Sequence, residues 1–146
     1  MENQASPLHA AALSCPALPT CGLALAESER YLPGLIDRIE AACDEVGLAG
    51  EEIMIRMTGC PNGCARPYAA EIGLVGKAPG RYQIWLGGNE ASTRMAHLWK
   101  DNVKDAEIIS ELRPMLERFA RERRIGERFG DWTDRERSAE PIQAVA

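Results

Sequence analysis

The sequence has no lysine or arginine before Arg30 and no long uninterrupted apolar run. A secretory signal needs a positively charged start and a transit peptide is rich in arginine, so we expect neither here. The apolar stretch 8–26 is broken by His9, two prolines, two cysteines and Gly22, and no basic anchor flanks it. We therefore expect no membrane span, and a cytoplasmic location.

The chain also lacks an excess of positive charge, since 17 Lys and Arg stand against 22 Asp and Glu, a net charge of −5. Proteins that bind nucleic acid or anionic membranes carry a basic face, so we expect neither partner. An anionic small ligand is still compatible, because local arginines can override the net charge. The 146 residues, 45% of them hydrophobic, fit one globular domain.

Hydrophobic periodicity predicts an α+β domain. Apolar side chains recur at helical spacing after Pro33, which suits a first helical turn, and Gly47 follows as a stop: Leu32, Leu35, Ile36, Ile39 and Cys43. Residues 53–57 read as a strand. Period-two alternation over about 71–87, around a Pro79-Gly80 turn, predicts a hairpin. We expect a small mixed sheet that includes this hairpin, packed with several helices.

Other segments are predicted less regularly. Residues 24–31 and 65–70 suggest short helical stretches. A longer helix is expected from Asp105 as N-cap, with Pro114 producing a kink or a break. We predict an irregular lead over 1–14, one domain over 15–133 and a disordered tail over 134–146.

Five cysteines in a chain expected in the cytoplasm indicate metal binding or redox chemistry more than disulfides. Cys43 falls on the helical stripe, so we interpret it as a small buried apolar residue. The other four form two pairs, Cys15 and Cys21 spaced C-x5-C, and Cys60 and Cys64 spaced C-x3-C. Each pair has proline after its first cysteine, a shared pattern that disfavours the alternative of four unrelated buried thiols.

Four thiolates on rigid loops are typical of a 4Fe-4S cluster. Proline fixes such a loop, and glycine lets the backbone approach a ligand closely. Zinc also takes four thiolates, although the C-x5-C pair fits its usual spacing less well. Spacing alone therefore favours iron–sulfur over zinc and leaves both open.

Three segments are more specific: CPALPTCGLALAESER, IRMTGCPNGCARPYAAEIGLVGKAPGRYQIWLGG and ERFGDWTDR. Together they resemble the C-terminal part of the siroheme-dependent assimilatory sulfite reductases, to which the nitrite reductases are close relatives. The resemblance runs from about Cys15 to about Arg135. It implies a nitrite/sulfite reductase 4Fe-4S domain-like fold, and an oxidoreductase that reduces sulfite to sulfide in a multi-electron reaction.

The resemblance also implies roles for single residues. The expected ligands of a 4Fe-4S cluster are Cys15, Cys21, Cys60 and Cys64. Cys64 is also the implied axial thiolate of the siroheme iron and so the implied catalytic residue, and the side chain of Asn62 is expected to meet the siroheme. One sulfur shared by two redox centres would let electrons pass directly between them, and a thiolate pushes electron density onto a haem iron.

Partners follow from the same resemblance. The full reductases are several times longer, so the N-terminal half of the reductase is the implied partner, with sulfite or nitrite as substrate. The electron donor is ferredoxin, which ARPY and YQIWLGG suggest, or a flavoprotein subunit, which GKAPGRY suggests. If the other half normally covers the apolar loop 8–26, that loop should be exposed in this chain.

Two hypotheses of other classes stay open at this point. One is a non-enzymatic iron–sulfur module for electron transfer or cluster binding, and the other is a structural zinc domain. Five cations could serve an anionic ligand or pair with acidic residues: Arg56, Arg66, Lys77, Arg81 and Arg94.

Overall fold

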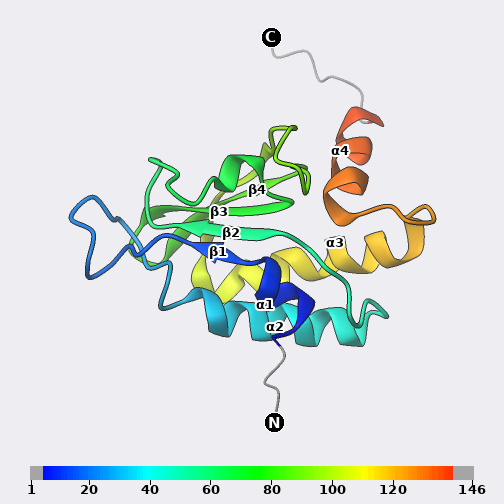
Figure 1. The fold of residues 1–146 in the computed structure, drawn as a ribbon, viewed down its shortest axis with the longest axis horizontal. Helices are drawn as coiled ribbons and strands as arrows, with labels where there is room; N and C mark the ends of the chain where they lie inside the picture. The colour runs from blue at the N-terminus through cyan, green and yellow to red at the C-terminus, as the bar shows by residue number, and fades with distance from the viewer. Residues whose placement is uncertain (1–4, 140–146) are drawn as a thin grey trace.

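The computed structural model describes residues 5–139 and contains a single five-stranded sheet (Figure 1). Its strands, in both spatial and chain order, are β1 (Leu13–Ser14), β2 (Ile55–Thr58), β3 (Ile72–Ala78), β4 (Arg81–Leu86) and β5 (His97–Lys104). The β1–β2 and β2–β3 pairs are parallel, and the β3–β4 and β4–β5 pairs are antiparallel. This mixed sheet with its helices confirms the predicted α+β class.

The described residues also form four α-helices: α1 (Pro7–Ala11), α2 (Leu32–Glu45), α3 (Ile108–Glu122) and α4 (Phe129–Ala139). Two short 3-10 helices are η1 (Pro67–Ala69) and η2 (Asp105–Glu107). Helices α2 and α3 lie along one face of the sheet (Figure 1). The main core fills the space between them and the strands, with side chains such as Ile36, Met57, Leu74, Ile84 and Leu112 fully buried. No helix among the described residues is long and apolar enough to cross a membrane.

Several predicted elements are confirmed. Helix α2 begins with Pro33 in its first turn, buries its predicted stripe and is followed by Gly47 at φ 85°. The hairpin expected at 71–87 is the β3–β4 pair, and Gly80 in its turn has φ 63°. Glycine tolerates this left-handed conformation because it has no Cβ.

The lead over 1–14, predicted as irregular, carries α1 and β1. The Ser6 side chain caps α1 by accepting a hydrogen bond from the His9 amide at 3.3 Å, and Pro7 occupies the first turn. The His9 ring then hydrogen-bonds Asp37 of α2 at 2.8 Å. Residues 1–4 of this predicted lead lie outside the described residues.

The helix predicted over 24–31 is wrong, because tertiary hydrogen bonds take its backbone donors. The amides of Leu25 and Ala26 both donate to the carbonyl of Gly59, at 2.8 and 3.0 Å. The segment forms turns instead. The helical stretch expected over 65–70 reduces to η1, a single 3-10 turn.

Helix α3 is continuous through Pro114, so the break suggested there is wrong. Asp105 starts η2, where its carboxylate accepts from the Ala106 amide at 2.7 Å, and α3 follows from Ile108. Helix α4 includes residues 134–139, which were predicted as part of a disordered tail. Ion pairs of Arg118 with Glu136 (2.6 Å) and of Arg135 with Glu127 (2.9 Å) fix it. The rest of that predicted tail, 140–146, lies outside the described residues.

Candidate metal-cluster site

Parallel pairing of β1 and β2 brings the two cysteine pairs to one edge of the sheet. Parallel strands run in the same direction, so their carboxyl ends meet at the same edge. Cys15 directly follows β1, and its amide donates to the carbonyl of Met57 in β2 at 3.1 Å. Cys60 comes two residues after the end of β2. Each strand therefore delivers the first thiol of its pair to the same place.

The loop after Cys15 folds back on itself to present the second thiol. The Cys21 amide donates to the carbonyl of Ala17 at 2.7 Å, and Ala17 has the positive φ of 52°. Ala17 is also buried, and a Cβ built on Gly59 would lie only 2.6 Å from its methyl group. Only glycine fits at position 59, so the two cysteine loops pack directly against each other.

The CPNGC turn is held by local hydrogen bonds and by one aromatic side chain. The Gly63 amide donates to the carbonyl of Cys60 at 3.4 Å, and the Tyr68 hydroxyl donates to the carbonyl of Pro61 at 2.8 Å. The Tyr68 ring packs on Gly63 and meets the Trp85 ring of β4 edge to face at 4.9 Å. Burial, with the nearby Cys60 second, raises the pKa of Tyr68, so its hydroxyl stays a donor.

All four predicted thiols line one cavity of about 160 Å³ whose wall is almost entirely apolar. Its other lining residues come from the two loops and the end of β2: Pro16, Ala17, Thr20, Leu23, Ala24, Thr58, Gly59 and Asn62. The volume is several times that of one water molecule, ~30 Å³. The four cysteines are free thiols. The structure thus brings together every residue that the sequence predicted as a ligand, around a space larger than one ion needs.

The spacing of the sulfurs argues against a mononuclear zinc site. Tetrahedral zinc with bonds of ~2.3 Å would hold its sulfurs about 3.8 Å apart. Among the described residues, only His9, Asp37 and Glu40 bring three metal-ligating atoms within 4.8 Å of one another. No three of the four cysteine sulfurs are that close, whereas a four-iron cube, being wider than one ion, keeps its ligands further apart.

Two nitrogen donors point at cysteine sulfurs. The amide of Gly59 donates to Cys15 Sγ at 3.3 Å, and the side-chain amide of Asn62 donates to Cys64 Sγ at 3.2 Å. Hydrogen bonds to sulfur stabilise the negative thiolates that bind a cluster and tune its potential. Sequence reasoning placed Asn62 at a macrocycle and did not single out Gly59, whose donor is a backbone group.

Cys64 differs from the other three ligand candidates in being exposed. The residue therefore borders both the cavity and the outer surface. Cys43, by contrast, is buried in α2, and burial raises the pKa of its thiol to about 11. It stays protonated at neutral pH and lies apart from the cavity, in agreement with the interpretation from the sequence.

Two arginines near the second cysteine pair make no ion pair within residues 5–139. They are Arg56 of β2, which donates to the carbonyl of Arg66 at 3.5 Å, and Arg66 itself. Burial and the like charge of Arg66 lower the pKa of Arg56. Lys77 and Arg94 are instead paired, with Asp101 (2.9 Å) and Asp131 (2.8 Å). Arg81, at the start of β4, likewise has no ion pair among residues 5–139. Arg56 and Arg66 are the unpaired cations near the second cysteine pair, where they are available to an outside anion.

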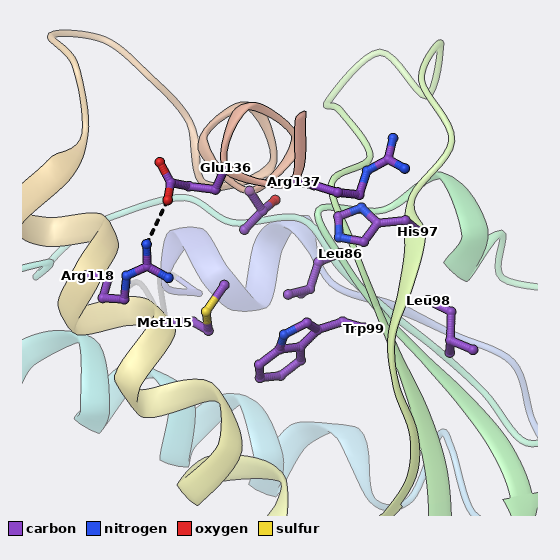
Figure 2. A pocket seen from close by; sticks show the side chains of 9 residues that line it. Leu86, His97, Leu98, Trp99, Met115, Arg118, Glu136 and Arg137 are labelled. Carbon is purple, nitrogen blue, oxygen red and sulfur yellow. Dashed lines mark hydrogen bonds and ion pairs between the residues drawn. The ribbon is translucent and has the colours of Figure 1, made fainter. Parts of the chain in front are cut away.

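A larger hollow of about 340 Å³ lies between β5, α3 and α4 (Figure 2). It shares no lining residue with the cysteine cavity. Its Arg118 already pairs with Glu136 and Glu122, so that cation is neutralised. Trp99 and Met115 contribute apolar wall (Figure 2). No cysteine lines this hollow, whereas the four predicted thiol ligands all line the smaller cavity.

Comparison with known proteins finds relatives over nearly the whole chain. The family model described as "Nitrite and sulphite reductase 4Fe-4S domain" matches residues 11–136. The chain is 56% identical over 135 residues to the sulfite reductase (NADPH) hemoprotein beta-component of Chromohalobacter salexigens, covering 92% of this chain and 24% of that protein. It is also 56% identical over 131 residues to the protein of the same name from Acidithiobacillus ferrooxidans, covering 90% of this chain and 23% of that protein.

A solved structure, that of the NirA protein of Mycobacterium tuberculosis, has the same fold. It superimposes with a TM-score of 0.76 at 23% identity, over 90% of this chain and 26% of that one. The chain thus spans about a quarter of the length of the relatives that it matches.

Proposed function

The chain belongs to the family of nitrite and sulphite reductase 4Fe-4S domains, and from this premise we propose that it is the cluster-and-siroheme segment of a sulfite reductase hemoprotein. The proposed whole enzyme reduces sulfite to sulfide by a multi-electron reaction. Its 4Fe-4S cluster and siroheme together supply electrons and a site for the sulfur substrate. The observation that carries the proposal is that all four motif cysteines line one apolar cavity.

We assign the cluster to Cys15, Cys21, Cys60 and Cys64. The apolar wall excludes water, and the Gly59 amide lowers the cost of negative charge on Cys15. Four ligands from two loops also explain why Gly59 and Ala17 must pack so closely. The zinc alternative is disfavoured by the separation of the sulfurs.

We assign the sulfur shared with siroheme to Cys64, because it alone among the four is exposed. Asn62 holds this sulfur by donating its amide at 3.2 Å, a contact that orients the thiolate and withdraws some of its charge. Arg56 and Arg66 are available for the carboxylates of the macrocycle. Sulfite itself, and the electron donor, would be bound with the help of the rest of the longer polypeptide.

A reconstitution with matched variants tests the proposal. The chain is incubated anaerobically with iron, sulfide and siroheme, and absorption, iron and acid-labile sulfide are measured. We expect four irons per chain, the usual complement of such a cube, together with macrocycle bands. Serine at Cys15, Cys21 or Cys60 should remove most of the iron, and Cys64→Ser should also remove the coupling between cluster and macrocycle.

Cys43→Ala is the control, because this thiol lies outside the cavity, and it should leave the iron content unchanged. A chain that takes up neither cluster nor macrocycle, or that binds one zinc per chain in preference to iron, contradicts the proposal. A chain that takes up the cluster and no macrocycle would instead support a cluster-binding module.

A further inference from the structure

Thr58 ends β2 at the cysteine cavity, and its hydroxyl has no hydrogen-bond partner among the described residues. The residue is 1% exposed, and its side chain lines the cavity together with the four thiols. Buried hydroxyls in folded proteins are almost always hydrogen-bonded, so one that is not calls for an explanation. A group bound in the cavity would supply the polar partner that the protein itself does not offer.

The direction of Thr58 follows from the alternation of side chains along a strand. Ile55 and Met57 of β2 are fully buried in the main core. Thr58 therefore faces the opposite side of the sheet, where the two cysteine loops lie. The neighbouring polar side chains leave it unpaired, since Thr20 is exposed and the amide of Asn62 donates to Cys64 Sγ.

We propose that Thr58 is a positioning residue whose hydroxyl donates a hydrogen bond to a sulfur of the bound cluster, either an inorganic sulfide or a cysteine thiolate. This inference rests on the proposed function. The next residue supplies a precedent, because the Gly59 amide already donates to Cys15 Sγ at 3.3 Å. Residues 58 and 59 would then form a pair of donors, one from a side chain and one from the backbone.

Such a hydrogen bond has a specific consequence for the reduction potential. Reduction adds negative charge to the cluster, and a donor stabilises the more negative form more strongly. Hydrogen bonds to sulfur are one of the factors that set cluster potentials. Thr58 should therefore raise the potential, which makes the cluster easier to reduce by its donor. A purely structural threonine would affect stability and leave the potential unchanged.

The test compares reconstituted wild-type chain with Thr58→Val, which keeps the shape and removes the hydroxyl, and with Thr58→Ser, which keeps the hydroxyl. The matched control is Thr133→Val, because Thr133 is also buried but donates to the carbonyl of Gly130 at 3.0 Å, outside the cavity. The potential is measured by redox titration followed by electron paramagnetic resonance, and the cluster content by iron and sulfide analysis.

At a fixed potential near the wild-type midpoint, we expect Thr58→Val to lower the ratio of reduced to oxidised cluster by up to about five-fold. That limit corresponds to one ordinary hydrogen bond made in full only to the reduced cluster. Thr58→Ser and Thr133→Val should stay at the wild-type ratio. If Thr58→Val holds no cluster, Thr58→Ala replaces it in the same titration. If neither Thr58→Val nor Thr58→Ala holds a cluster while Thr58→Ser does, that result also supports the contact. Circular dichroism must then show that all three variants are folded.

An unchanged potential in a fully loaded Thr58→Val chain overturns this inference and leaves the proposed function standing. If the wild-type chain takes up no cluster, the proposed function fails and this inference fails with it. The iron content of the wild-type sample therefore tells the two failures apart.

Discussion

At the scale of single residues, Glu127 shows how charge fixes the segment that leads into α4. Arg135 donates to both carboxylate oxygens of Glu127, at 3.0 and 2.9 Å, and the Arg124 amide donates at 3.0 Å. The bonds from Arg135 are the largest cause that lowers the pKa of Glu127 to about 2. The folded state therefore prefers this carboxyl ionised.

This shift predicts a pH dependence of stability. Because the pKa of Glu127 is lower in the folded than in the unfolded chain, the ion pair stabilises the fold above the ordinary value of 4.5. That contribution is lost as the pH falls from 4.5 toward 2. We expect Glu127→Gln to lower the urea midpoint near neutral pH, and the difference from wild type to shrink near pH 3.5.

The control for this experiment is Glu117→Gln, since Glu117 is half exposed and lies 3.4 Å from Arg113. It should change the midpoint little at either pH, as exposed pairs usually do. A difference between wild type and Glu127→Gln that stays constant from neutral pH to pH 3.5 would contradict the assignment.

Glu71 is a fully buried carboxylate that joins three segments of the chain. It accepts hydrogen bonds from the Met54 amide at 2.8 Å, the Gly130 amide at 3.0 Å and Arg128 at 2.8 Å. It thereby connects the entry to β2 and the start of α4 to the residue before β3. Removing one partner of such a buried pair leaves a charge and two amides unpaired.

We therefore expect Glu71→Ala to lower the free energy of unfolding by about 3–5 kcal/mol, measured by urea denaturation. Glu90→Ala is the matched control, because Glu90 lies 3.5 Å from the same arginine but its side chain is 64% exposed. It should cost less than about 1 kcal/mol. Equal stability of the two variants would refute the central role of Glu71.

At the scale of elements, strand β3 packs directly against the loop that carries Cys60 and Cys64. A Cβ built on Gly76 of β3 would lie 2.3 Å from the carbonyl oxygen of Gly59 and 2.9 Å from the methyl group of Ala26. The same carbonyl accepts the amides of Leu25 and Ala26, which tie the first loop to the second. The absence of a side chain at Gly76 thus lets both loops close over the strand.

We expect Gly76→Ala to displace the carbonyl of Gly59 and to reduce the iron taken up in reconstitution by roughly half or more. Gly34→Ala is the control, since nothing lies within 4 Å of a Cβ built there. Within α2 that change should stabilise the helix by about 0.5–1 kcal/mol and leave the iron content unchanged. Full iron in a folded Gly76→Ala chain would show that the contact does not position the loops.

The sequence predicted the elements whose side-chain pattern is local and strong. The stripe of α2 and the alternation of the β3–β4 hairpin are of this kind, and both are confirmed. Strand β5 was not predicted, because only Val103 of its eight residues is buried and charged side chains break any alternation. Helix α4 was missed because it packs on the rest of the domain through Trp132, which contacts Phe119 of α3. Such a tertiary contact is not visible in the local sequence.

The candidate site also has parts that local sequence predicts and parts that depend on tertiary contacts. Cysteine spacing grouped four thiols that the structure does bring around one cavity, and the resemblance to the sulfite and nitrite reductases is confirmed by the family match. The roles of these four cysteines as cluster ligands stay predictions. The contact of Gly59 with Cys15 and the place of Thr58 in the cavity wall could not be derived from the sequence. A contact across 44 residues leaves no trace in the local pattern.

At the scale of the whole molecule, large apolar side chains lie exposed on the stretch 8–26, which carries the first cysteine pair. Leu13 of β1 is 49% exposed, and Leu23 and Leu25 of the first loop are 70% and 42% exposed. The prediction that stretch 8–26 would be exposed therefore holds for these side chains and fails for Leu8, Ala17 and Ala26, which are buried. Adjacent exposed apolar residues are typical of a surface that another structure covers.

Since the relatives are about four times longer than this chain, we expect the rest of such a polypeptide to cover these leucines, and the isolated chain to self-associate through them. Sedimentation velocity over a range of concentrations should show dimers or larger species, and Leu23→Lys with Leu25→Lys should shift the chain toward monomer.

The control is Ile125→Lys, because Ile125 is fully exposed in the turn between α3 and α4, away from both cysteine loops. Its distribution should match wild type, since a lone exposed apolar side chain rarely drives association. A wild-type chain that stays monomeric at every concentration would mean that these leucines need no cover. That result would contradict the expectation that the rest of a longer polypeptide packs on them.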